Sequence, residues 1–204
     1  MDLRSGLFTI YDGGKHELPY TDIEKSLFYR RDGLIISCCK RGITLNETKE
    51  IANSDHAFDN DMVESCMKFF IKLFKILDSL SDIKMFDNFL NNYQTNLLFL
   101  NPGHISTFWA KKYISVISSN IMGFNVRTSE VENINIPSTD LNRFSQAPIY
   151  PQVSNKLGLK FNNSDRKYIL RYDGKKVNEV SFDEYIEILY DYYNFLIKFD
   201  VTSF

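Results

Sequence analysis

The chain contains 204 residues, with 24 Lys plus Arg, 26 Asp plus Glu and a formal net charge of -2. This length and an apolar content of 44% exclude a disordered or collagen-like chain and fit one packed globular domain. A net charge near zero also excludes a polycation that coats nucleic acid or an anionic membrane with its whole surface, so any such contact must be local.

The composition also predicts where the protein works. Three cysteines, Cys38, Cys39 and Cys66, make an odd number, so a disulfide framework is not expected. Residues 1–10 lack the pattern of a secretory signal, and we expect a soluble, cytoplasmic protein. The longest apolar stretch, residues 62–80, is interrupted by five charged residues, so we expect no membrane span and no membrane partner. Frequent Ile and Asn with few Ala indicate an AT-rich coding genome, such as that of a low-GC bacterium, phage, virus or protist.

The first forty residues predict a short β/α unit. A strand over residues 7–11 is followed by a helix over 21–31, which begins at a capping box. Gly33 is expected to end that helix, because glycine is favoured just after a helical C-terminus. The apolar run LIISCC at 34–39 then predicts a buried central strand.

The middle of the chain predicts helices. Residues 46–61 are polar and irregular, and their last aspartates are expected to cap a helix that extends to residue 80. Apolar residues recur at spacings of three and four over 62–80, which predicts a helix in the centre of the fold. A second helix over 82–93 is expected to complete a helical hairpin. A short buried strand or turn segment at 97–100 and a helix over 105–121 follow.

The last third of the chain contains the clearest local pattern. Residues 124–163 show no regular periodicity, which predicts a long loop or an irregular β region. The run KYILRY, the dipeptide Asp173-Gly174 and the run KKVNEV together predict a β-hairpin with a two-residue turn. A capping box at residues 181–184 begins an amphipathic helix that is expected to end near residue 199.

These elements predict the fold class and the domain organisation. The chain is expected to be a single α+β domain over residues 1–204, with a possible subdivision near 123–137. Its parts would be an N-terminal β/α unit, a central helical hairpin, and a C-terminal β-hairpin followed by an amphipathic helix.

Three residues suggest a catalytic alternative. Nucleases of the restriction-endonuclease type place one acid ahead of an acid-x-Lys pair, so that two carboxylates hold Mg²⁺ and the lysine orients water. Asp32, Glu47 and Lys49 have about that spacing. The polar neighbours of Glu47 do not fit a buried strand, so an Mg²⁺-dependent nuclease stays an alternative hypothesis.

Other constellations in the sequence are weaker. Residues 55–61 contain three aspartates and His56, but their spacing matches neither an EF-hand nor a zinc helix, and helix capping explains them better. Ser106-Thr107 after His104, with Glu130-Val131-Glu132 further on, loosely resemble the Ser-Thr and Glu-x-Glu elements of ADP-ribosyltransferases. The segment between them, however, is predicted to be a helix where those enzymes have a pair of strands. No phosphate-binding glycine loop is present, so we expect no ATP or NAD cofactor, and no metal.

Charge is distributed unevenly near the end of the chain. Residues 156–176 are basic, whereas residues 177–204 are acidic, so the two segments either neutralise each other or offer a surface to a partner. The candidate partner-binding residues are Lys160, Arg166, Lys167, Arg171, Lys175 and Lys176.

The leading hypothesis is therefore a non-catalytic intracellular binding protein, such as an inhibitor, immunity or accessory factor. It would act through a macromolecular interface, with a protein as the preferred partner. Nucleic acid bound by the basic segment is the second hypothesis, and the nuclease is the third.

Overall fold

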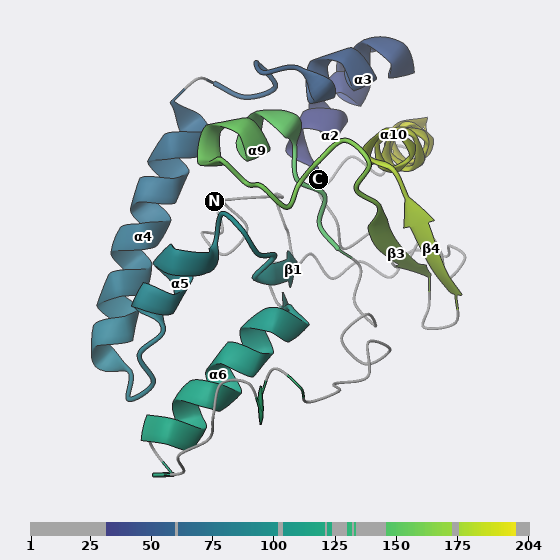
Figure 1. Ribbon diagram of the computed structural model, residues 1–204. Coiled ribbons are helices and arrows are strands. Elements are labelled where there is room, and N and C mark those ends of the chain that lie inside the picture. Colours follow the sequence, from purple (N-terminus) through teal and green to yellow (C-terminus); the bar gives the residue numbers. More distant parts are fainter. Residues whose placement is uncertain are drawn as a thin grey trace.

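The computed structural model describes residues 32–59, 61–101, 104–120, 122–123, 130–131, 133, 146–172 and 176–198 (Figure 1). Helices and two antiparallel hairpins make a mixed α+β fold, which confirms the predicted class. The strand expected at 7–11 and the helix expected at 21–31 lie outside the described residues. The elements along the chain are α2 (Gly33–Lys40), α3 (Leu45–Asn53), α4 (Met62–Leu80), α5 (Phe86–Asn92), β1 (Phe99–Asn101), β2 (His104–Ile105), α6 (Thr107–Asn120), α9 (Pro151–Leu157), β3 (Tyr168–Tyr172), β4 (Lys176–Val180) and α10 (Phe182–Lys198).

The predicted central strand at 34–39 is wrong, because these residues form helix α2. Asp32 caps the helix by accepting hydrogen bonds from the amides of Leu34 and Ile35. Gly33 is consequently the first residue of this helix and not the cap that ends a preceding one. A short apolar run fits a buried helix as well as a buried strand, and here the cap and the packing against α10 select the helix.

Two further helices occupy segments in which no regular structure was expected. Helix α3 begins at a capping box, in which Thr44 and Glu47 each bind the backbone amide of the other. Helix α9 begins at Pro151, whose fixed φ and missing amide suit the first helical position, and it ends at Gly158 with φ +64°. The polar composition around α3 and the prolines around α9 concealed both helices.

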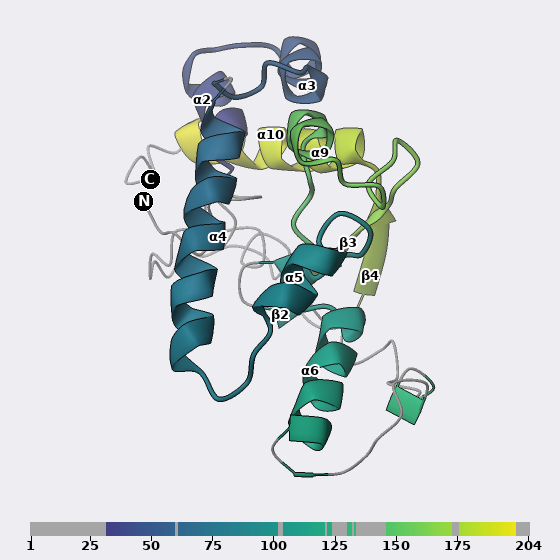
Figure 2. The ribbon, with the colours of Figure 1, turned by 60° about the vertical axis from the view of Figure 1, so that its left-hand side comes forward.

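The helical hairpin of α4 and α5 is confirmed, but α4 is not central. Figures 1 and 2 show α4 as an outer helix of the molecule. Its buried residues are Val63 and Met67, and its other apolar stripe faces outward. The side chain of Asp78 accepts hydrogen bonds from the amides of Met85 and Phe86, which fixes the start of α5.

The C-terminal β-hairpin is confirmed, and its register is defined. β3 pairs with β4 from Tyr168↔Val180 to Tyr172↔Lys176. This register leaves three residues between the strands, so the expected two-residue turn is wrong; residues 173–175 themselves lie outside the described part of the chain. The segment before α9 connects the two hairpins, because Ala147 N donates to Leu100 O at 2.7 Å and Gln146 N donates to Ile169 O at 2.8 Å.

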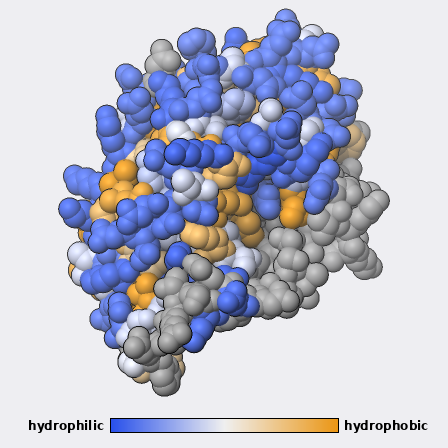
Figure 3. Space-filling view, in the orientation of Figure 1, coloured by the Kyte–Doolittle hydropathy of each residue, from blue (hydrophilic) through white to orange (hydrophobic). Residues whose placement is uncertain are grey.

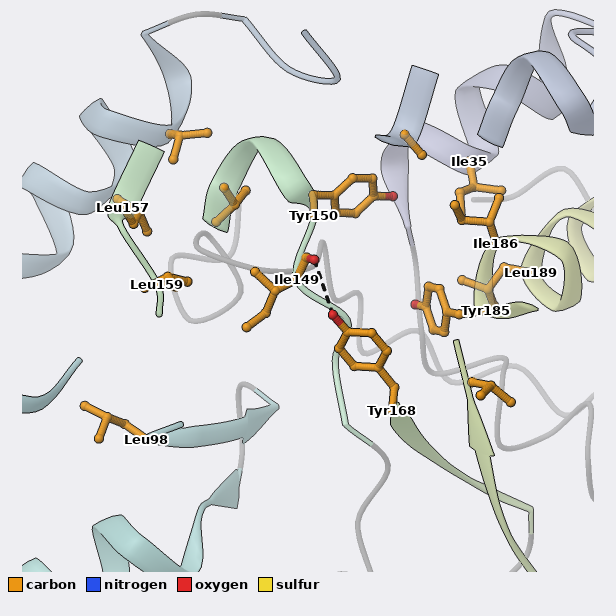
Figure 4. Packing of buried hydrophobic residues seen from close by; sticks show 14 of the residues in the cluster. Ile35, Leu98, Ile149, Tyr150, Leu157, Leu159, Tyr168, Tyr185, Ile186 and Leu189 are labelled. Atoms are coloured by element: carbon orange, nitrogen blue, oxygen red, sulfur yellow. Dashed lines mark hydrogen bonds between the residues drawn. The ribbon is translucent and has the colours of Figure 1, made fainter. Parts of the chain in front are cut away.

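Helix α10 is the centre of the core. Its inward face is almost fully buried and packs against α2, α3 and β4. In Figure 4, Ile186 of α10 lies beside Ile35 of α2, and both belong to one buried cluster with Leu189. The hydroxyl of Tyr168 donates to Ile149 O at 3.4 Å, which ties β3 to the segment before α9 (Figure 4). None of the helices in the described part of the chain has an apolar stretch long enough to cross a membrane.

Candidate functional site

Asp32 lies in a buried polar centre where three helices meet. Its carboxylate accepts a hydrogen bond from the hydroxyl of Tyr150, whose oxygen lies 2.7 Å from both carboxylate oxygens. The same carboxylate caps α2. The Asp32 amide donates to the hydroxyl of Tyr193 at 2.9 Å. Asp32 therefore connects the start of α2 to the residue before α9 and to α10. The sequence contained no signal of these contacts, because the partners are 118 and 161 residues away.

The electrostatics of this centre follow from its burial. Removal from water raises the pKa of Asp32, although the hydrogen bonds from Tyr150 and from the α2 amides oppose the shift. Burial and the neighbouring carboxylate raise the pKa of Tyr150 well above its ordinary value. Asp32 is 4% exposed, so a substrate in solution cannot reach it. Its geometry is that of a structural connection between helices.

The other two residues of the nuclease hypothesis also have local structural roles. The Glu47 carboxylate binds the amide and the hydroxyl of Thr44, which lowers its pKa. Lys49 forms an ion pair with Glu187 of α10 at 3.0 Å. Among the described residues, no group of three or more His, Cys, Asp or Glu side chains is arranged to hold a metal ion.

The structure describes part of the predicted basic surface. Lys160 and Lys167 are exposed, and Lys167 lies 3.7 Å from Glu184 of α10. Arg166 is half-buried between the rings of Phe161 and Tyr168, with its guanidinium carbon 5.2 Å from each ring centroid.

Two further residues of that predicted surface lie in the strands of the β3–β4 hairpin. Arg171 lies in β3 and Lys176 lies in β4, whereas Lys175 lies outside the described residues. The basic and acidic segments thus neutralise each other at Lys167, while Arg166 is held by aromatic packing.

His104 lies where the β1–β2 hairpin meets helix α6. β2 pairs with β1 so that His104 faces Asn101, and α6 begins three residues after His104. Ser106 is buried, and its hydroxyl accepts a hydrogen bond from the amide of Trp109. Ser106 thereby caps the start of α6. Partial burial lowers the pKa of His104, which favours its neutral imidazole, the form that can accept a proton.

The cysteines are free thiols with different surroundings. Cys38 and Cys39 are buried in α2, and Cys66 on α4 is half-buried. Burial raises the pKa of Cys38, and burial together with Cys38 raises the pKa of Cys39 to about 12. Because the thiolate is the reactive form, Cys38 and Cys39 are poor nucleophiles.

Comparison with known proteins gives a likeness of fold. No protein-family model and no curated protein matches the chain. A solved structure of WcbI is similar; it is described as a novel polysaccharide biosynthesis enzyme, in its native form without a disulfide bond between coenzyme A and one of its cysteines. The likeness has a TM-score of 0.59 at 14% identity and covers 98% of this chain and 64% of that chain. The chain therefore shares its fold with about two thirds of the length of a larger protein.

Proposed function

We propose that the protein is an enzyme of polysaccharide biosynthesis that takes a coenzyme A thioester as its acyl donor. The observation that carries the proposal is the likeness to WcbI, which extends over 98% of this chain. One fold can host several activities, so the proposal also needs a group in this chain that can do the chemistry.

His104 is the candidate for that group. A neutral imidazole at the start of a helix is suited to accept the proton of a sugar hydroxyl. The sugar oxygen would form an ester bond with the acyl carbon as the carbon–sulfur bond breaks, and the departing thiolate would take the proton from His104. The amides at the start of α6 favour negative charge, such as that of a phosphate or of an oxyanion.

The proposal places the protein in the cytoplasm, where acyl thioesters are made and where free thiols stay reduced. It differs from the non-catalytic role expected from the sequence, which rested on the lack of a coherent catalytic motif.

Calorimetric titration with coenzyme A, followed by acetyl-coenzyme A, tests the proposal. Wild-type protein should bind both and slowly release the thiol from acetyl-coenzyme A by transfer of the acyl group to water. His104→Gln should retain binding but release the thiol about 100-fold or more slowly, which is the usual contribution of a general base. His56→Gln, on the exposed turn after α3, is the matched control and should behave as wild type. A folded wild-type protein that binds neither compound would refute the proposal.

Binding of a macromolecular partner by the basic segment is the second candidate function. Lys160 is exposed and the side chain of Lys167 is 52% exposed, so both ammonium groups are accessible to another anion, although Lys167 also pairs with Glu184 at 3.7 Å. An acidic protein surface is the preferred partner, and nucleic acid is the alternative.

The salt dependence of binding to mixed-sequence DNA and RNA tests this second candidate. Affinity should fall steeply as salt rises, and the double variant Lys160→Glu with Lys167→Glu should abolish it. Lys198→Glu at the end of α10 is the control. An affinity for DNA and RNA that does not change with salt concentration would exclude nucleic acid as the partner. An acidic protein that binds the double variant as well as it binds wild type would exclude this surface as its binding site.

A further inference from the structure

Helix α4 carries a second apolar stripe that the core does not use. Phe69, Ile76, Leu77 and Leu80 are 46%, 49%, 55% and 81% exposed, although the inward stripe of the same helix contains Val63 and Met67. Large apolar side chains gathered on one helix face mark an interaction surface, whereas scattered ones do not. Figure 3 shows apolar side chains among hydrophilic ones on the side of the molecule where α4 lies.

A row of lysines borders this stripe. Lys68, Lys72 and Lys75 are all exposed and follow one another at spacings of four and three, so they lie on one flank of the helix. The side chain of Lys68 is 80% exposed, and its distance to Glu64 is 4.0 Å, too long for a hydrogen bond. The partner that binds this stripe must therefore accommodate apolar side chains next to a row of positive charges.

We propose that α4 binds the surface of an anionic lipid bilayer, with Phe69, Ile76 and Leu80 inserted and the three lysines at the headgroups. A helix with an apolar face and a lysine-rich flank is the usual form of a helix that lies in the membrane interface. Long lysine side chains can reach the headgroups while their aliphatic stems follow the apolar surface. This contact differs from a membrane span and modifies the expectation that the protein has no membrane partner.

The shape of the surface distinguishes this occupant from others. α4 is a projecting outer helix, which Figures 1 and 2 show at the edge of the molecule with α5 and α9, the helices that it packs against, on one side of it. A partner helix is normally held in a groove, which a projecting helix does not provide, whereas a bilayer surface receives a projecting one. A second copy of the chain would bring two lysine rows together, and such like charges oppose association.

Flotation of the full chain with lipid vesicles tests the proposal. Wild-type protein should float with phosphatidylcholine vesicles that contain phosphatidylglycerol and remain unbound with phosphatidylcholine alone. Replacing all three lysines by Gln should weaken binding on the order of 100-fold, because each lysine near an anionic surface contributes roughly a fivefold factor. The triple variant Lys40→Gln, Arg41→Gln, Lys198→Gln removes the same charge from exposed positions elsewhere and should bind within about twofold of wild type.

A tryptophan substituted into the stripe tests whether its side chains insert into the bilayer. Phe69→Trp should show a blue shift of its emission with anionic vesicles, whereas Ile114→Trp, at a position on α6 that is 39% exposed, should not. The double variant Ile76→Ser with Leu80→Ser should lose flotation while it unfolds at the same denaturant concentration as wild type.

Three results would overturn the proposal. One is the absence of wild-type binding to anionic vesicles, and another is unchanged binding of the lysine or serine variants. The third is an α4-dependent dimer, or an acidic protein bound through α4 in the absence of lipid.

Discussion

A single buried carboxylate, Asp32, is the residue on which the packing of three helices depends. It caps α2, accepts the hydroxyl of Tyr150 and offers its amide to Tyr193. A buried charge is stable only when it is well hydrogen-bonded, and here the α2 amides and one tyrosine supply those bonds. Even so, the raised pKa of Asp32 means that burial outweighs them.

We predict different effects for two substitutions of Asp32. Asp32→Ala removes the cap and leaves the buried hydroxyl of Tyr150 without its acceptor, so the free energy of unfolding should fall by about 2 to 4 kcal/mol. Asp32→Asn retains a side-chain oxygen that can cap α2 and accept the hydrogen bond from Tyr150, and it removes the buried charge. This variant should therefore be as stable as wild type at neutral pH. Urea denaturation of the two variants measures this; equal losses in both would show that the charge itself is required.

The same residue gives a pH dependence of a defined sign. The pKa of Asp32 in the folded chain lies above the value of about 3.9 in an unfolded chain, so the folded state binds this proton more tightly. Its contribution to stability therefore falls as pH rises from about 4 through the folded-state pKa. The stability of wild type minus that of Asp32→Asn, measured from pH 3 to 8, should decline with pH. A difference that rises with pH would contradict the buried geometry.

At the scale of elements, the contact between α3 and α10 shows how the candidate nuclease residues are used. Lys49 pairs with Glu187, and the side-chain amide of Asn53 donates to Asp183 at 2.8 Å. These exposed contacts place α3 along α10, while the capping box at Thr44 fixes where α3 begins.

We predict that Thr44→Ala destabilises the protein by about 1 kcal/mol, because one amide at the start of α3 loses its acceptor. The pKa of Glu47 should rise toward its ordinary value, because the Thr44 hydroxyl is the largest cause of its lowering. Ser79→Ala, at an exposed serine on α4 that binds a carbonyl, is the control and should change stability by less than about 0.5 kcal/mol. Denaturation and an NMR titration of Glu47 check both effects; an unchanged pKa in Thr44→Ala would show that the box does not form in solution.

The elements differ in how well the sequence predicted them. Local patterns were sufficient to predict the long helices α4, α6 and α10, which have a helical period or a capping box, and the β3–β4 hairpin, which has the alternation of strands. α2 was assigned to a strand because a six-residue apolar run has no unambiguous period. The Asp32 centre was not predictable, because Tyr150 and Tyr193 approach it only through the tertiary fold.

At the scale of the whole molecule, α10 joins parts that are far apart in sequence. Leu189 is fully buried within the cluster that includes Ile35, Val153 and Tyr168. The link from β1 through residues 146–147 to β3 adds a continuous path of backbone hydrogen bonds between the two hairpins.

We predict that Leu189→Ala lowers the free energy of unfolding by about 2 to 5 kcal/mol, because it leaves a cavity in the core. Leu80→Ala, at a leucine that is 81% exposed, should change it by less than about 0.5 kcal/mol. The fluorescence of Trp109 and the far-ultraviolet circular dichroism should report one shared transition if residues 1–204 are a single domain. Separate transitions would place a domain boundary in the chain.

The central proposal is that a coenzyme A thioester binds where β2 meets α6. Hydrogen exchange of the backbone amides, with and without coenzyme A, locates the binding site without knowledge of the sugar acceptor. We predict slower exchange over residues 104–112 and no change over 62–80 of α4. No protection anywhere, or protection confined to the β3–β4 hairpin, would contradict the proposal.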